Sequence, residues 1–231
     1  MPARDKIVDL RKLLAERFPP TATSRAARLR TGLAFLDDAV EGGFPQGAIT
    51  EIVSPHLSAG SATLIAALIA AAQRDSYFVA LIDGRDSLSP DSLGNDCLRH
   101  LLWVRCTKAA DAIKAADLLL RDGNFPLVIV DLVLNAADQL RKIAQTSWYR
   151  LQRLVESTSS ACVVFDRRSM VASARLKLVL ETQWTLANLD SENATSELRI
   201  TGGRRVVNAS PARTAQNLGH DDACPSIAQA S

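Results

Sequence analysis

Short apolar runs alternate with longer amphipathic runs over most of this chain, and this alternation is the strongest constraint on its fold. The predicted strands cover 48–53, 78–83, 101–104, 126–131 and 161–165. The predicted helices cover 34–40, 62–74, 111–121 and 145–156. Strands that are apolar throughout and alternate with helices are typical of a parallel sheet that is buried on both faces. We therefore expect an α/β fold with a mostly parallel central sheet and helices on both faces.

The pattern changes near the C-terminal end of the chain. Apolar and polar residues alternate with period two over 176–182 and 197–200, and a turn at 201–204 leads into 205–207. This alternation predicts antiparallel strands added at one edge of the sheet.

Two further segments flank the predicted core. Residues 5–18 have one apolar helical face, and Pro19-Pro20 ends this helix before a linker. We divide the chain into an N-terminal helix and linker (1–30), a core domain (31–208) and a disordered tail (209–231). The helix could dock on its own domain, on a partner, or on a second copy in a homo-oligomer.

Composition narrows the class of protein. The chain has 231 residues, 47% of them hydrophobic, and a formal net charge of +2, so any nucleic-acid contact needs a local basic patch. No apolar run reaches the roughly 18 residues of a membrane span, and the charged N-terminus is unlike a signal peptide. Cys97, Cys106, Cys162 and Cys224 are widely separated, without a C-x-x-C pair. We expect a cytoplasmic protein with reduced thiols, no membrane contact and no metal site.

The stretch SPHLSAGSATL, residues 54–64, lies between a predicted strand and a predicted helix, where a phosphate-binding loop would be. Such a loop uses a lysine to span the β- and γ-phosphates, but Gly60 or Ser61 takes that position here. The chain has no lysine between Lys12 and Lys108. The degenerate loop consists of Ser54, Pro55, Ser58, Gly60, Ser61 and Thr63. We expect no cofactor, and at most weak binding of ATP and magnesium by amides and hydroxyls. We also expect the loop to close on itself, with Ser58 or Ser61 capping the helix.

Carboxylates end two of the predicted strands. Asp131 fits a Walker B carboxylate, which orients magnesium through water, or else it caps the strand end or the next helix. Asp83 ends another strand, but Arg85 follows two residues later, and an arginine cannot act as a general base.

Basic residues follow the last two apolar strands. They are Arg141, Lys142, Arg150, Arg153, Arg167 and Arg168. With Trp148 and Tyr149 nearby, they could bind single-stranded DNA or an acidic partner segment at the edge where open α/β sheets bind ligands. The alternative is a solvated helix with buried aromatic residues.

Residues 31–165 resemble the ATP-binding core of RecA recombinases. The resemblance is carried by TGLAFLDDAVEGGFPQGAITEIVSP, FVALIDGRDSLSP and PLVIVDL, and it implies a RecA-type fold. RecA proteins have Gly-Lys-Thr/Ser where this chain has Gly60-Ser61-Ala62, and a catalytic glutamate where it has Arg85. They also carry a long glycine-rich DNA-binding loop where 166–169 leads quickly into the next strand.

The stretches LLWVRC, KAADLLLRDGNFPLVIVDL and SWYRLQRLVE are similar to the degenerate RecA-like group called ImuA. This resemblance implies a non-catalytic accessory factor of SOS-induced translesion DNA synthesis. The implied partners are an ImuB-like protein and an error-prone polymerase, with RecA and single-stranded DNA as further contacts. One alternative is a DNA-dependent ATPase or recombinase whose unusual P-loop borrows a basic residue from a neighbouring subunit. Another is a fold remnant with a different small ligand.

Overall fold

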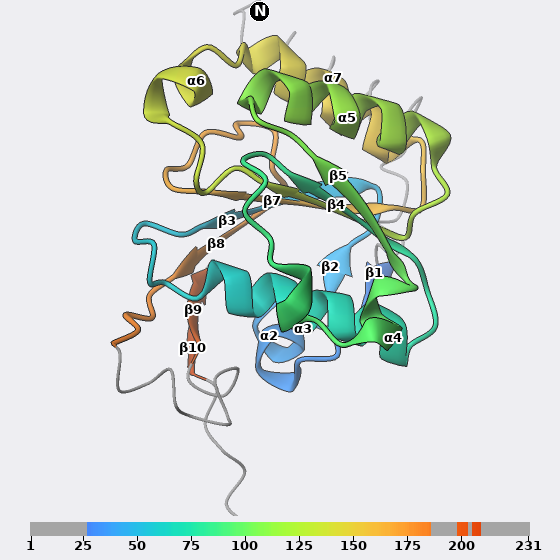
Figure 1. Ribbon diagram of the computed structural model, residues 1–231, viewed down its shortest axis with the longest axis vertical. Coiled ribbons are helices and arrows are strands. Elements are labelled where there is room, and N and C mark those ends of the chain that lie inside the picture. The colour runs from blue at the N-terminus through green and yellow to red at the C-terminus, as the bar shows by residue number, and fades with distance from the viewer. Residues whose placement is uncertain (1–26, 186–197, 203–204, 209–231) are drawn as a thin grey trace, which may run out of the picture.

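A computed structural model describes residues 27–185, 198–202 and 205–208, the last of these by backbone alone (Figure 1). The predicted N-terminal helix and the C-terminal tail lie outside these residues, so the statements about them stay predictions.

An eight-stranded sheet forms the centre of the molecule, in the order β10-β9-β8-β3-β7-β6-β4-β5. The strands are β3 (Ala48–Val53), β4 (Val79–Asp83), β5 (Leu101–Arg105), β6 (Leu127–Asp131), β7 (Ala161–Asp166), β8 (Leu176–Leu180), β9 (Arg199–Gly202) and β10 (Arg205–Asn208). From β8 to β5 every neighbouring pair is parallel. The expected mostly parallel sheet is therefore confirmed.

The edge formed by the last three strands differs from the prediction in one respect. β9 is antiparallel to both β8 and β10, as expected, but β8 is parallel to β3. The period-two pattern of β8 reflects a strand with one exposed face near the sheet edge, and such exposure does not fix strand direction.

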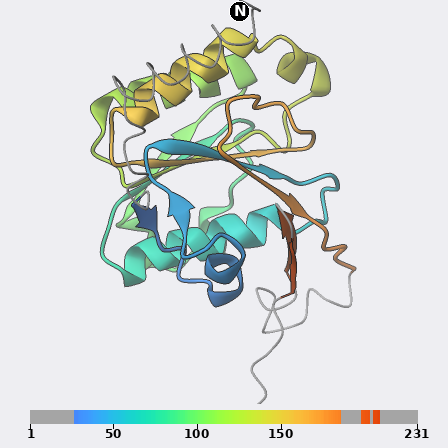
Figure 2. The same ribbon diagram turned by 180° about the vertical axis from the view of Figure 1, so that it is seen from behind.

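Helices cover both faces of this sheet (Figures 1 and 2). On one face lie α2 (Ala34–Ala39), α3 (Ser61–Arg74) and α4 (Asn95–Leu98). On the other lie α5 (Ala109–Asp122), α6 (Ala137–Arg141) and α7 (Gln145–Glu156). The two faces bury separate apolar clusters. β3 contributes to both of them, since Ile49 packs toward α7 and Ile52 packs toward α3.

Helical periodicity explains which side of each long helix is buried. Trp148, Leu151 and Val155 of α7 are buried at spacings of three and four residues, as an amphipathic helix requires. The sequence did not predict α4, α6, the 3-10 turn at Pro90–Ser92, or the small sheet of β1 (Arg28–Leu29) and β2 (Phe44–Pro45). These elements are too short to show a hydrophobic period.

Two observations bear on the expected class of protein. Among the described residues, no helix is both long enough and apolar enough to cross a membrane. Cys97, Cys106 and Cys162 carry free thiols, and burial raises the pKa of Cys162 to about 12.

Candidate functional site

The carboxyl ends of the parallel strands meet at one edge of the sheet, and most of the predicted site residues lie along it. Asp83 of β4 lies directly beside Asp131 of β6, and Val53 of β3 lies beside Asp166 of β7. Open α/β sheets bind their ligands at this edge.

The loop after β3 is closed by its own hydrogen bonds. The carbonyl oxygen of His56 accepts a bond from the Ser54 hydroxyl (3.1 Å) and another from the Ala59 N–H (3.2 Å). The Ser54 N–H donates to the carbonyl of Asp166 at 2.7 Å, which ties the loop to β7. Ala59 is buried in the core, and Leu57 is 62% exposed. The Ala59 N–H is therefore engaged within the loop rather than facing a ligand.

Gly60 connects this loop to α3, and it corrects the prediction of a serine cap. Gly60 is the N-cap residue, with φ +92°, and no side chain of the described ranges caps the helix. Ser61 is already the first helical residue, and Ser58 uses its carbonyl to accept the Trp184 N–H at 2.9 Å. A side-chain cap needs an extended N-cap residue with an oxygen, whereas a left-handed position favours glycine.

The segment after β8 covers the loop, which the sequence did not predict. A Cβ atom added to Gly60 would lie 2.8 Å from Trp184 Nε1 and would also collide with the Leu198 side chain. Leu198 is fully buried, and Trp184 Nε1 is buried with no hydrogen-bond partner among the described residues. The glycine is therefore required by packing against this chain's own C-terminal region.

The two strand-end aspartates serve local structure. Asp83 accepts backbone bonds from Ser87 (2.7 Å), Leu88 (2.8 Å) and Arg85 (3.2 Å), so its carboxylate organises the turn after β4. Asp131 Oδ1 accepts the Val133 N–H at 3.0 Å, which matches the capping role considered for it. Burial raises the pKa of Asp131 to about 6, and the charge of Asp83 adds to this effect.

Groups suited to phosphoryl transfer are sparse around this edge. Ser61, at the position of the P-loop lysine, is buried, and Arg85 is exposed to solvent. Within the described ranges, no group of three His, Cys, Asp or Glu side chains could hold a metal ion. The loop after β3 and the start of α3 offer hydroxyls and the helix N-terminus to an anion, and residues 54–63 contain no lysine or arginine.

Glu51 is a second buried carboxylate with four hydrogen-bond donors near this edge, and the sequence did not single it out. Its buried carboxylate accepts the N–H groups of Met170 (2.5 Å) and Val171 (2.6 Å), the Ser169 hydroxyl (2.8 Å) and the Lys177 ammonium (2.7 Å). Burial alone would raise the pKa of Glu51, but these donors lower it overall. Glu51 therefore fixes the short loop that follows β7.

Asp166 has the opposite electrostatic environment. The residue is fully buried, and within the described part of the chain no hydrogen bond of good geometry reaches its carboxyl oxygens. The nearby Arg168 amide and Lys177 ammonium favour the charged form of Asp166, but they are outweighed. Burial, together with the neighbouring charge of Glu51, raises the pKa of Asp166 to about 9. Asp166 is therefore protonated at neutral pH.

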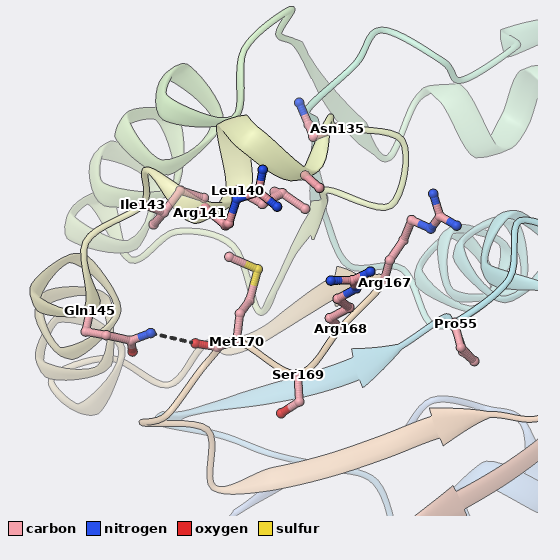
Figure 3. A pocket seen from close by; sticks show the side chains of 11 residues that line it. Pro55, Asn135, Leu140, Arg141, Ile143, Gln145, Arg167, Arg168, Ser169 and Met170 are labelled. Atoms are coloured by element: carbon pink, nitrogen blue, oxygen red, sulfur yellow. Dashed lines mark hydrogen bonds between the residues drawn. The ribbon is translucent and has the colours of Figure 1, made fainter.

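A pocket of about 420 Å³ lies between the ends of β6 and β7 and the helices α6 and α7 (Figure 3). Its lining residues are Pro55, Asn135, Ala137, Leu140, Arg141, Ile143, Gln145, Arg167, Arg168, Ser169 and Met170. Asn135 donates to the Gly84 carbonyl at 2.7 Å, and Gln145 donates to the Met170 carbonyl at 3.3 Å. Asn135, Gln145 and Met170 were not predicted, because nothing in the local sequence indicates that these three segments converge.

The structure divides the six predicted basic residues. Arg141, Arg167 and Arg168 line the pocket, whereas Lys142, Arg150 and Arg153 do not. Lys142 lies 3.8 Å from Asp138, and Arg150 lies 2.6 Å from Asp117 of α5. Lys142 is the C-cap residue of α6, and Arg150 and Arg153 lie on α7, where they are exposed to solvent.

The two aromatic residues of α7 are also separated. Trp148 is fully buried, and Tyr149 is 53% exposed but does not line the pocket. Trp148 is therefore buried as in the alternative of a solvated helix with buried aromatic residues, whereas Tyr149 is not.

Comparison with known proteins gives a consistent result. A family model described as the RecA N-terminal domain matches residues 20–142, more than half of the 231 residues. Protein RecA of Rubrobacter xylanophilus is 36% identical over 116 residues, which are 48% of this chain and 33% of that protein. Protein RecA of Picosynechococcus is 33% identical over 120 residues, 51% of this chain and 34% of that protein. Protein RecA of Chlorobaculum parvum is 34% identical over 165 residues, 64% of this chain and 47% of that protein. The chain thus spans about a third to a half of the length of these relatives.

Proposed function

The chain belongs to the RecA N-terminal domain family, and from this premise we propose that it is a non-catalytic member that acts through protein contacts. The observation that carries the proposal is the replacement of the phosphoryl-transfer groups. Ser61 occupies the lysine position, and Arg85 occupies the position of the catalytic glutamate. Phosphoryl transfer depends on positive charge at the β- and γ-phosphates, and a serine hydroxyl supplies none.

The remaining carboxylates support the same proposal. Asp83 accepts four hydrogen bonds from the turn that follows it, and Asp131 caps the next turn. A carboxylate that is engaged in this way is poorly placed to act as a base for an attacking water. We therefore propose that the chain has no nucleotide cofactor and binds ATP and magnesium weakly at most.

Within the family, we place the chain in the ImuA-type group of accessory factors in DNA damage tolerance. The support is the similarity of LLWVRC, KAADLLLRDGNFPLVIVDL and SWYRLQRLVE to that group. The proposed partners are an ImuB-like protein and an error-prone polymerase, with RecA, single-stranded DNA and a second copy of the chain as further contacts. The proposed location is the cytoplasm.

A second candidate function is a DNA-dependent ATPase or recombinase of the RecA type. It is favoured by the open first turn of α3, which has no side-chain cap and no acidic residue. Such a helix end attracts phosphate. A neighbouring subunit would then have to supply the missing cation.

Steady-state ATP turnover with and without oligo(dT) decides between these two functions. The proposed function predicts no release of phosphate above that of an Asp131→Asn control in either condition. DNA-stimulated turnover that disappears in the Asp131→Asn variant would contradict the proposal and support the ATPase.

A further inference from the structure

We propose that the pocket between α6 and the end of β7 binds an acidic peptide segment of a partner protein, with one bulky apolar side chain between its carboxylates. This inference rests on the proposed function, since an accessory module needs a site for a partner. The proposed site is the pocket between α6 and the end of β7, and the proposed ligand is an acidic peptide.

Unneutralised positive charge is the first argument. Arg141, Arg167 and Arg168 line the pocket, and within the described ranges none of them forms an ion pair. Lys142 and Arg150, which lie outside the pocket, both have an aspartate partner. The three pocket arginines come from two segments, α6 and the loop after β7, and so line the pocket from more than one element (Figure 3). Guanidinium groups bind carboxylates through paired, charge-assisted hydrogen bonds.

The apolar part of the lining is the second argument. Pro55, Leu140, Ile143 and Met170 all line the cavity, and all four are partly buried. A volume of about 420 Å³ falls within the range of pockets that enclose most of a small ligand. Arginines around an apolar interior match a segment whose apolar side chain enters the pocket while flanking carboxylates remain at its mouth.

The pocket is also held in shape before any ligand arrives. Glu51 fixes the backbone of Met170 and Val171, and Gln145 of α7 donates to the Met170 carbonyl. Asn135 is buried and bonded to Gly84, which fixes the opposite wall. A preformed site loses less conformational entropy on binding, so a short segment can be recognised.

Single-stranded DNA fits this pocket less well than a peptide does. Proteins that bind single strands combine basic residues with aromatic side chains on which the bases stack. Among the residues that the structure describes, no aromatic side chain lines this pocket, and the exposed Tyr149 lies outside it. The interior offers aliphatic and thioether surface, which suits a leucine or methionine side chain better than a base.

Fluorescence anisotropy with the full chain, in the absence of ATP, tests the proposal. The probes are a labelled peptide that alternates aspartate with leucine, a peptide that alternates asparagine with leucine, a peptide that alternates aspartate with serine, and labelled oligo(dT). The variants are Arg167→Gln with Arg168→Gln, and the matched control Arg153→Gln, which removes an exposed charge from α7 outside the pocket. Thermal unfolding of each variant shows whether it is folded.

We expect the aspartate–leucine peptide to bind more tightly than the other three probes. Arg167→Gln with Arg168→Gln should weaken that binding by about tenfold or more, because each loses a charge-assisted hydrogen bond, while Arg153→Gln leaves it unchanged. If the aspartate–serine peptide bound as tightly as the aspartate–leucine peptide, the pocket would not recognise an apolar side chain, and that part of the proposal would be wrong. Oligo(dT) binding more tightly through the same arginines would assign the pocket to DNA, and no peptide binding at millimolar concentration would overturn the proposal. None of these outcomes depends on ATP turnover, so the proposed function can fail separately.

Discussion

Glu51 of β3 and Asp166 of β7 lie on adjacent strands as two buried carboxyl groups with opposite electrostatic environments. Glu51 accepts four hydrogen bonds, one of them from the ammonium of Lys177, and its pKa is lowered. Burial and the charge of Glu51 raise the pKa of Asp166 to about 9. The pair therefore carries one proton at neutral pH, and that proton is on Asp166.

This pair predicts a specific dependence of stability on pH. Between the ordinary pKa of an aspartate, 3.8, and about 9, folded Asp166 keeps a proton that the unfolded chain has released. The free energy of unfolding contributed by this group is therefore highest at low pH and falls as pH rises through that window, by about 1.4 kcal/mol per pH unit at most. Asp166→Asn removes this slope. Urea unfolding at several values of pH should show that the free energy of unfolding of the variant rises relative to that of the natural chain as pH rises.

The matched control is Asp91→Asn, which makes the same chemical change at an exposed carboxyl in the short 3-10 turn. Its unfolding profile should follow that of the natural chain. If Asp166→Asn showed the same pH slope as the natural chain, the assignment of the proton to Asp166 would be wrong.

Glu51 should be the more sensitive member of the pair. Glu51→Gln replaces a charged acceptor by an amide, which cannot accept all four of the present hydrogen bonds. We expect a loss of about 2 kcal/mol in the free energy of unfolding, since hydrogen bonds to charged groups are the stronger ones. Hydrogen exchange should become faster at the amides of Met170 and Val171. Lys177→Met, which removes one half-exposed partner, should leave those amides protected, and equal exchange in both variants would contradict the role given to Glu51.

The regular part of the fold could be predicted from the sequence because it depends on periodicity. The apolar runs became β3, β4, β6 and β7, and the helix predicted at 145–156 is α7, Gln145–Glu156. Strand direction at the sheet edge could not be predicted, because period-two exposure is the same in parallel and antiparallel edge strands. Elements of four or five residues, such as α4 and α6, are shorter than two helical turns and show no period.

The candidate site could be predicted only where its residues are close in sequence. The loop at 54–63 and the strand-end aspartates follow from local patterns. The pocket brings together Pro55, Asn135, Gln145 and Met170, which are distant in sequence and meet only through the strand order. Glu51 was missed because a glutamate within an apolar strand indicates burial but does not reveal its partners.

Restoring the missing loop residues should restore nucleotide binding without turnover. Ser61→Lys with Ala62→Thr recreates the lysine and hydroxyl of a P-loop at the start of α3. We expect the affinity for ATP and magnesium to improve by about tenfold or more, because a charge-assisted hydrogen bond contributes about 1.5–3 kcal/mol. The natural chain should bind more weakly than ~100 µM, about −5.5 kcal/mol. Isothermal titration measures both affinities. If the natural chain bound ATP more tightly than ~100 µM, it would be identified as a nucleotide sensor.

Turnover should stay absent in that variant, because Arg85 still occupies the position of the catalytic glutamate. Phosphate release from Ser61→Lys with Ala62→Thr would show that the loop alone had suppressed the activity.

Gly60 is expected to matter for packing whether or not nucleotide is present. Its φ of +92° is strained for any residue with a Cβ atom, and that atom would collide with Leu198 and approach Trp184 Nε1 to 2.8 Å. Gly60→Ala should therefore lower the free energy of unfolding by about 2 kcal/mol or more. Gly94→Ala is the matched control, because Gly94 has a φ of −63° and open space around its Cα, and it should leave stability nearly unchanged.

A double-mutant cycle separates collision from backbone strain at this position. Leu198→Ala alone should cost about 2–5 kcal/mol, since it empties a fully buried site. In the Leu198→Ala background, the added methyl of Gly60→Ala gains space, so the double variant should be more stable than the sum of the two single changes by about 1 kcal/mol. Urea unfolding of the four proteins measures this coupling. Strict additivity would mean that Leu198 does not restrict Gly60, and that the left-handed backbone alone requires a glycine there.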